Sequence, residues 1–98
     1  MKELLYFEHS IMPFLKNFEI EKLHFKDGDF GDLTRFDIEN SNIFASVSFW
    51  TEEVVHMDII LKSGEGFLMN LLLFSEEKEK QIPALDQFKE LLIQQQND

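Results

Sequence analysis

The residue types best suited to chemistry in this sequence lie close together in its middle. His56 and Asp58 are separated by one residue, so they share a face if this segment is a β-strand. A serine on the neighbouring strand, Ser46 or Ser48, would complete the residue types of a hydrolase triad. A flat sheet face, however, offers neither a substrate pocket nor oxyanion donors, and this catalysis needs both. We therefore expect no enzymatic activity.

An acidic run from Asp27 to Asp32 raises the question of a calcium loop. An EF-hand loop needs Gly at its sixth position and a bidentate Glu at its twelfth. Counted from Asp27, those positions hold Asp32 and Ile38. The three histidines lack the spacing of metal ligands such as HExxH, and the chain contains no cysteine. We expect a solvated hairpin loop here and no metal or other cofactor.

Composition narrows the class of partner. The 98 residues suit one domain, residues 1–98, and the 19 acids against 9 bases give a net charge of −10. Nucleic acid and anionic membranes are disfavoured as partners because binding them needs clustered Lys and Arg. No segment has the apolar length of a membrane span, and Glu3, Glu8 and His9 interrupt any signal-peptide core. We expect a cytoplasmic protein.

The hydrophobic period divides the chain into elements. Apolar residues at three- and four-residue steps predict a helix over residues 1–19, kinked or broken near Pro13. A second helical region begins at Ser75, whose hydroxyl is expected to cap it, with Pro83 in the first turn of the main helix. Between them, alternation and turn residues predict strands at 20–26, 34–39, 43–50, 54–62 and 67–74.

Short connections require neighbouring strands to be antiparallel. The predicted fold is therefore α+β, a five-stranded antiparallel meander with the N- and C-terminal helices packed on one face (α-β-β-β-β-β-α). Alternation in the third and fourth strands assigns to the helix face Ile43, Ala45, Val47, Phe49, Val55, Met57, Ile59 and Leu61. The opposite face receives Phe44, Ser46, Ser48, Trp50, His56, Asp58, Ile60 and Lys62. In the fifth strand, Phe67, Met69, Leu71 and Leu73 are expected on one side and Leu68, Leu72 and Phe74 on the other.

Two short helices cannot cover both apolar faces of such a sheet. The face with Phe44, Trp50 and Ile60 is therefore expected to be an apolar patch, which usually marks an interface. Its expected acidic rim is Glu39, Glu52, Glu53 and Asp58. The same face could instead be buried in a homodimer or covered by a helix.

The segment from Ile43 to Trp50, followed by Thr51-Glu52-Glu53, carries a family resemblance. With the order helix, five-strand meander, helix, it resembles immunity proteins encoded beside polymorphic or contact-dependent growth-inhibition toxins in bacteria, especially the TriTu-type group. Their third strand ends in Trp before an acidic turn, and a hydrophobic-acid-hydrophobic stretch follows, to which Met57-Asp58-Ile59-Ile60 is similar. The family usually has a Gly in the turn after the Trp, where Glu53 and Val54 stand here.

The resemblance implies a cytoplasmic protein that binds a cognate toxin domain, often a nuclease, and neutralises it. A nuclease site is basic, so an acidic protein complements it electrostatically. The residues expected to bind the toxin are Phe44, Trp50, Glu52, Glu53, His56, Asp58 and Ile60, with Trp50 as the anchor. The alternative is a homo-oligomeric structural or adaptor protein that self-associates through this face. Another alternative for Trp50 itself is a core position beneath a helix.

Overall fold

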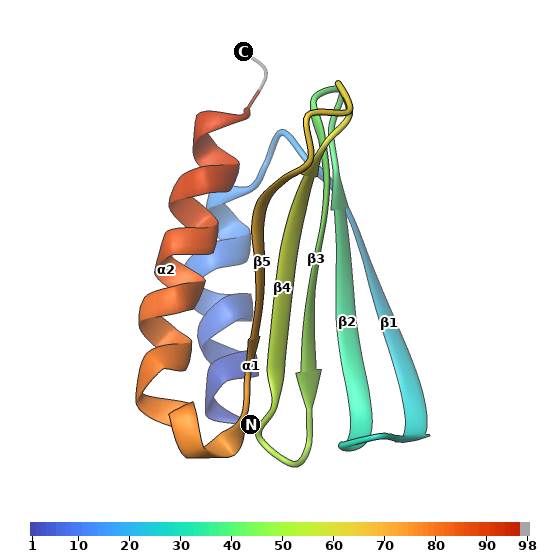
Figure 1. The fold of residues 1–98 in the computed structure, drawn as a ribbon, viewed down its shortest axis with the longest axis vertical. Helices are drawn as coiled ribbons and strands as arrows, with labels where there is room; N and C mark the ends of the chain where they lie inside the picture. The colour runs from blue at the N-terminus through green and yellow to red at the C-terminus, as the bar shows by residue number, and fades with distance from the viewer. Residues whose placement is uncertain (97–98) are drawn as a thin grey trace.

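A five-stranded antiparallel sheet forms one layer of the molecule, and two terminal helical segments form the other (Figure 1). The computed structural model describes residues 1–96. The strands lie side by side in sequence order: β1 Glu19–Gly28, β2 Gly31–Glu39, β3 Ile43–Trp50, β4 Val55–Leu61 and β5 Phe67–Leu73. Both helical segments lie on the same side of the sheet, as the predicted α+β meander requires.

The N-terminal segment is helical but shorter than predicted. The α-helix α1 (Lys2–Tyr6) continues into a π-helical stretch, η1 (Phe7–Ile11), and a 3₁₀ turn, η2 (Met12–Phe14). Pro13 lies inside that final turn, so the predicted break near it is confirmed. Proline has no backbone N–H and cannot continue the helical hydrogen bonds. The helix therefore ends at residue 14 instead of 19.

The C-terminal helical region begins at Ser75, as predicted, but its main α-helix begins earlier than predicted. A 3₁₀ turn, η3 (Ser75–Glu77), leads into α2 (Lys78–Gln94), so Pro83 lies in the second turn of α2 and not in the first. Phe74, and not Ser75, stands at the N-cap of η3, and no side chain makes a capping hydrogen bond there. Gln81 instead joins the start of α2 to the sheet, because its Nε2 donates to the Glu53 carbonyl at 2.8 Å and to the Leu73 carbonyl at 3.3 Å.

The core lies between the helices and one face of the sheet. Phe7 packs its ring 4.8 Å from that of Phe36 and 5.7 Å from that of Phe49, measured between centroids. The inward positions predicted for β3 and β4 are buried except Leu61, which is half-buried. From the helical layer, the core takes Phe7, Ile11, Leu85, Phe88 and Leu92. Strict alternation on two neighbouring strands is sufficient to predict this face because side chains alternate with period two.

β5 departs from simple alternation. Met69 lies opposite Ile59, but Phe67, and not Leu68, lies opposite Ile60, so the register shifts at a β-bulge. A bulge places two residues opposite one and changes which face the following side chain occupies. Leu68 consequently packs against the core, whereas Phe67 is exposed. The expectation that Phe67 shares a face with Met69, and Leu68 with Leu72, is therefore wrong.

Two hairpins show how the turns are built. Gly64 and Gly66 have φ values of +87° and +98°, which glycine adopts without a Cβ penalty, as expected for the β4–β5 turn. In the predicted loop 27–32, pairing extends further than expected: β1 continues to Gly28 and β2 begins at Gly31.

None of the helices within residues 1–96 has both the length and the apolar character needed to cross a membrane.

Candidate functional site

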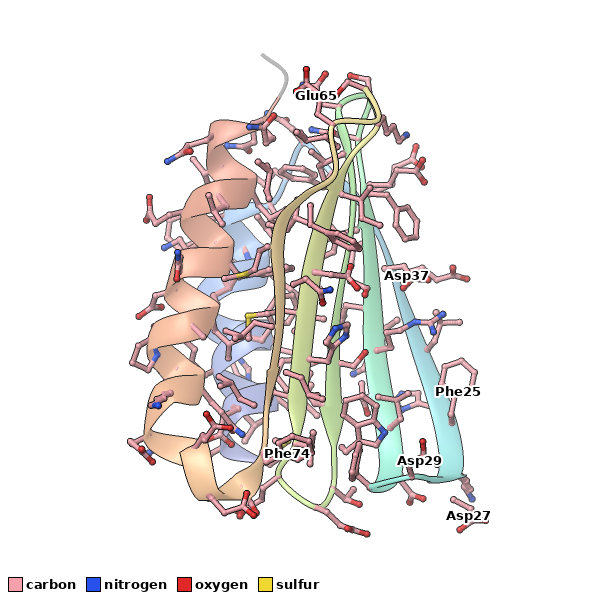
Figure 2. All side chains as sticks on the ribbon, viewed as in Figure 1. Phe25, Asp27, Asp29, Asp37, Glu65 and Phe74 are labelled. Atoms are coloured by element: carbon pink, nitrogen blue, oxygen red, sulfur yellow. The ribbon has the colours of Figure 1, made fainter. Side chains whose placement is uncertain are left out.

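The sheet face that points away from the helices is open, and we call it the outer face. Side chains such as Phe25 and Asp37 project from it on the side opposite the helical layer (Figure 2). Most of the large apolar side chains exposed in the described chain belong to it: Phe25, Phe44, Ile60, Phe67, Leu72 and Phe74. Soluble proteins seldom leave such a set uncovered unless it serves an interface.

Strand register divides the outer face into three zones. At the end of the sheet near the β4–β5 turn, three apolar residues lie in one row across β3, β4 and β5: Phe44, Ile60 and Phe67. At the opposite end lies an aromatic cluster: Phe30, Trp50 and Phe74. Polar side chains fill the middle, among them Ser46, His56, Asp58 and Asn70. The aromatic side chains at both ends of this face are of the kind that is enriched in protein interfaces.

The polar strip does not have the connectivity of a nucleophilic triad. Asp58 Oδ1 accepts hydrogen bonds from the Ser46 hydroxyl and from the Ser46 backbone N–H, both at 3.2 Å. His56 Nε2 lies 3.0 Å from Asn70 Oδ1, and its Nδ1 lies 3.9 Å from Asp58 Oδ2. A triad needs the serine bonded to the histidine. Here the Ser46 hydroxyl is hydrogen-bonded to the Asp58 carboxylate, and the other candidate serine, Ser48, is buried.

The structure places Trp50 on the outer face, not beneath a helix. It is partly buried there by Phe30, whose ring meets it edge-on at 5.4 Å between centroids, and Phe30 also meets Phe74 at 5.7 Å. Phe30 belongs to the tip of the β1–β2 hairpin. The tip is attached to the β3–β4 turn, because the Glu52 N–H donates to the Phe30 carbonyl and the Thr51 N–H to that of Asp32.

The two adjacent acids of the β3–β4 turn have different surroundings. Glu52 is exposed, and no ion pair to it occurs among residues 1–96. Glu53 has a φ of +66°, and its carboxylate forms an ion pair with Lys78 of α2 at 2.5 Å. This hydrogen bond raises the pKa of Lys78 above its usual value. Glu53 is thus engaged with the helical layer, unlike the other residues predicted to bind a partner.

Acidic residues not singled out from the sequence lie beside the apolar row. A cavity of about 290 Å³ opens next to Phe44, and we call it the acidic notch. Its other lining residues are Glu19, Ile20, Glu21, Asp37 and Glu39. Of these, only Glu39 was expected at the rim. The sequence does not indicate the others, because only the pairing of β1 with β2 places positions 19 and 21 directly opposite positions 39 and 37.

No metal-binding arrangement is present in the part of the chain that the structure describes. No group of three or more His, Asp or Glu side chains there is placed to hold a metal ion. In the acidic run, Asp32 Oδ1 accepts the Asp27 backbone N–H at 3.1 Å, and the Asp32 N–H donates to the Thr51 hydroxyl at 3.0 Å. This segment closes a hairpin and attaches it to its neighbour.

The fold and surface together define an α+β domain with an open, acidic and aromatic sheet face. Searches of protein-family models, curated proteins and solved structures find no match to this chain.

Proposed function

We propose that this protein is an immunity protein that binds a cognate toxin domain through its outer face and neutralises it without catalysis. The observation that supports the proposal most directly is that both helical segments cover one sheet face and leave the other open. Six large apolar side chains on that face are exposed to solvent. The resemblance of the segment around Trp50 to immunity proteins indicates the class of partner, a toxin domain.

The charge of the outer face favours a basic partner. Acids on or beside it outnumber bases, with Glu19, Glu21, Asp37, Glu39 and Asp58 on its strands. Arg35, which lies on the same face, is already held by Asp37, with its Nε 2.9 Å from Oδ1 and its Nη2 3.3 Å from Oδ2. A basic nuclease domain would neutralise the remaining charge. The attraction would also accelerate encounter between the proteins.

Self-association is the second candidate, because the same exposed apolar face would suit a homodimer. A symmetric dimer places one surface against its own copy. That arrangement would bring two sets of these carboxylates together and would be disfavoured by like-charge repulsion. Light scattering of the isolated protein distinguishes the two candidates. A dimer that dissociates when Ile60 is replaced by Asp would support self-association.

The decisive experiment is co-expression with the toxin domain encoded immediately upstream. Wild-type protein is expected to restore growth, and the double variant Phe44→Asp with Ile60→Asp is expected to lose protection. Leu5→Asp with Phe14→Asp is the matched control, since both side chains are exposed on the N-terminal helical segment, where they should not affect binding. Circular dichroism verifies that each variant is folded. Cell death despite soluble wild-type protein would refute the proposal.

A further inference from the structure

We propose that the partner inserts an arginine side chain into the acidic notch and seats an adjacent apolar side chain on the row Phe44, Ile60 and Phe67. This inference rests on the proposed function and specifies the chemistry of the partner's contact segment. It adds a second contact region, at the end of the outer face near the β4–β5 turn, to the one expected around Trp50.

The acidic notch holds more negative charge than the protein itself compensates. Lys62 forms an ion pair with Glu39 at 2.5 Å, and Arg35 forms one with Asp37. Among residues 1–96, neither Glu19 nor Glu21 has an ion pair. Two carboxylates on one strand thus remain available to a cation from outside.

The register of β1 and β2 places acidic residues opposite each other. Glu19 lies directly opposite Glu39, and Glu21 lies directly opposite Asp37. Like charges directly opposite each other destabilise an antiparallel sheet, whereas opposite charges there contribute about 0.2–1 kcal/mol. Lys62 and Arg35 offset this repulsion on the β2 side only, so the repulsion from Glu19 and Glu21 on β1 remains. A cation bound between the strands would relieve that repulsion.

The apolar row lies beside the notch. The bulge in β5 turns Phe67 outward, opposite Ile60, and Ile60 lies opposite Phe44. Phe44 also lines the notch, so the apolar and acidic parts share this residue. Arginine suits that junction better than lysine does. Its planar guanidinium can stack on an aromatic ring while forming two parallel hydrogen bonds with a carboxylate.

Other occupants fit this surface less well. A second copy of the chain would bring an equally acidic face to the notch, and the two faces would repel each other. A metal ion needs convergent ligands, and the described part of the chain has no group of side chains arranged in that way. A basic protein segment supplies both the positive charge and the apolar contact.

The binding test uses the toxin domain encoded immediately upstream and two pairs of matched variants. Phe67→Ala is compared with Phe14→Ala, because both side chains are 56% exposed but Phe14 lies on the helical segment. Glu19→Gln with Glu21→Gln is compared with Glu79→Gln and Glu90→Gln on α2, because each pair removes two negative charges. We expect the outer-face variants to bind at least about tenfold more weakly and the controls to bind as wild type.

A probe that does not depend on the toxin separates this inference from the proposed function. The peptide acetyl-Leu-Arg-Leu-amide is titrated at millimolar concentration against the isotopically labelled protein and followed by NMR, with acetyl-Leu-Gln-Leu-amide as control. We expect shifts to concentrate at Glu19, Glu21, Phe44 and Phe67 with the arginine peptide only. Shifts spread over α2, shifts equal for both peptides, or no shifts would overturn the inference.

The combined outcomes distinguish the two proposals. If wild-type protein binds and neutralises the toxin while the outer-face variants match their controls, the notch inference is wrong and the function stands. If the protein does not bind the toxin but the arginine peptide gives the expected shifts, the immunity function is wrong and the preference of the notch for arginine stands.

Discussion

Trp50 and Phe30 meet edge to face, with their ring planes at 88° and their centroids 5.4 Å apart. The contact joins the end of β3 to the tip of the β1–β2 hairpin. Trp50 thus combines two roles in this structure: it holds a neighbouring hairpin and still presents part of its ring on the outer face.

Replacement of Trp50 by Ala tests whether this side chain anchors the toxin domain. We expect the dissociation rate from the toxin domain to rise at least about tenfold, as for an interface hot spot. Loss of the contact with Phe30 should also lower the free energy of unfolding by roughly 0.5–1.5 kcal/mol beyond the lost burial. Surface plasmon resonance and thermal melting measure the two effects on the same protein. An unfolded variant would contradict the placement of Trp50 as a partner-binding residue.

Charge reversal at the two acids of the β3–β4 turn should give different results. Glu52→Lys is expected to slow association with a basic partner several-fold, most strongly at low salt, because Glu52 is exposed and unpaired within residues 1–96. Glu53→Lys is expected mainly to lower the melting temperature, because it sets two cations against each other at Lys78. Stopped-flow association at several salt concentrations and thermal melts measure these effects. Equal association rates for Glu52→Lys and wild type would argue against this turn's role in encounter.

Replacement of Gly31 in the β1–β2 hairpin should destabilise the fold far more than replacement of Gly64 in the β4–β5 turn. Gly31 and Gly64 have similar φ values, +93° and +87°. A Cβ on Gly31 would lie 2.2 Å from the Thr51 hydroxyl oxygen, whereas nothing lies within 4 Å of one on Gly64. Gly64→Ala is expected to cost about 1–2 kcal/mol for left-handed backbone alone.

Gly31→Ala should lower the free energy of unfolding by about 1–3 kcal/mol more than Gly64→Ala does, because overpacking adds to the backbone strain. Urea denaturation of both variants measures the difference. Equal losses of stability would mean that the tip is not held against Thr51 as the structure has it.

The hydrogen bond between Tyr6 and Asp86 predicts that the stability of the fold falls at alkaline pH. Its hydroxyl donates to Asp86 of α2, and this bond raises the pKa of Tyr6 above its usual value. The folded state therefore retains the phenolic proton more strongly than the unfolded state does. The stabilisation is fully present below about pH 10, the pKa of unfolded Tyr, and is lost as pH rises through the higher folded pKa.

Comparison of wild type with Tyr6→Phe isolates this effect from that of Lys78, whose pKa is also raised and which both proteins retain. The difference in melting temperature between the two proteins should shrink as pH rises above about 10. A difference that stays constant over this range would contradict the hydrogen bond to Asp86.

The sequence predicts much of this fold because local patterns decide it. Residues 43–50 and 54–62 alternate cleanly, and two neighbouring strands with the same apolar period can bury only one set of side chains. The short connections then permit only antiparallel neighbours. From this alternation, Phe44, Trp50, His56, Asp58 and Ile60 were all predicted on the outer face, where the structure has them.

The remaining features were decided by the tertiary structure. Both alternation sets of β5 are apolar, so only pairing with β4 could set the bulge that turns Phe67 outward. In the sequence, Glu52 and Glu53 look equivalent, and only the packing of α2 places Lys78 beside Glu53. The acidic notch depends on the register that places Glu19 opposite Glu39, which lies 20 residues further along the chain. Contacts of this kind join residues distant in sequence, and no local pattern specifies them.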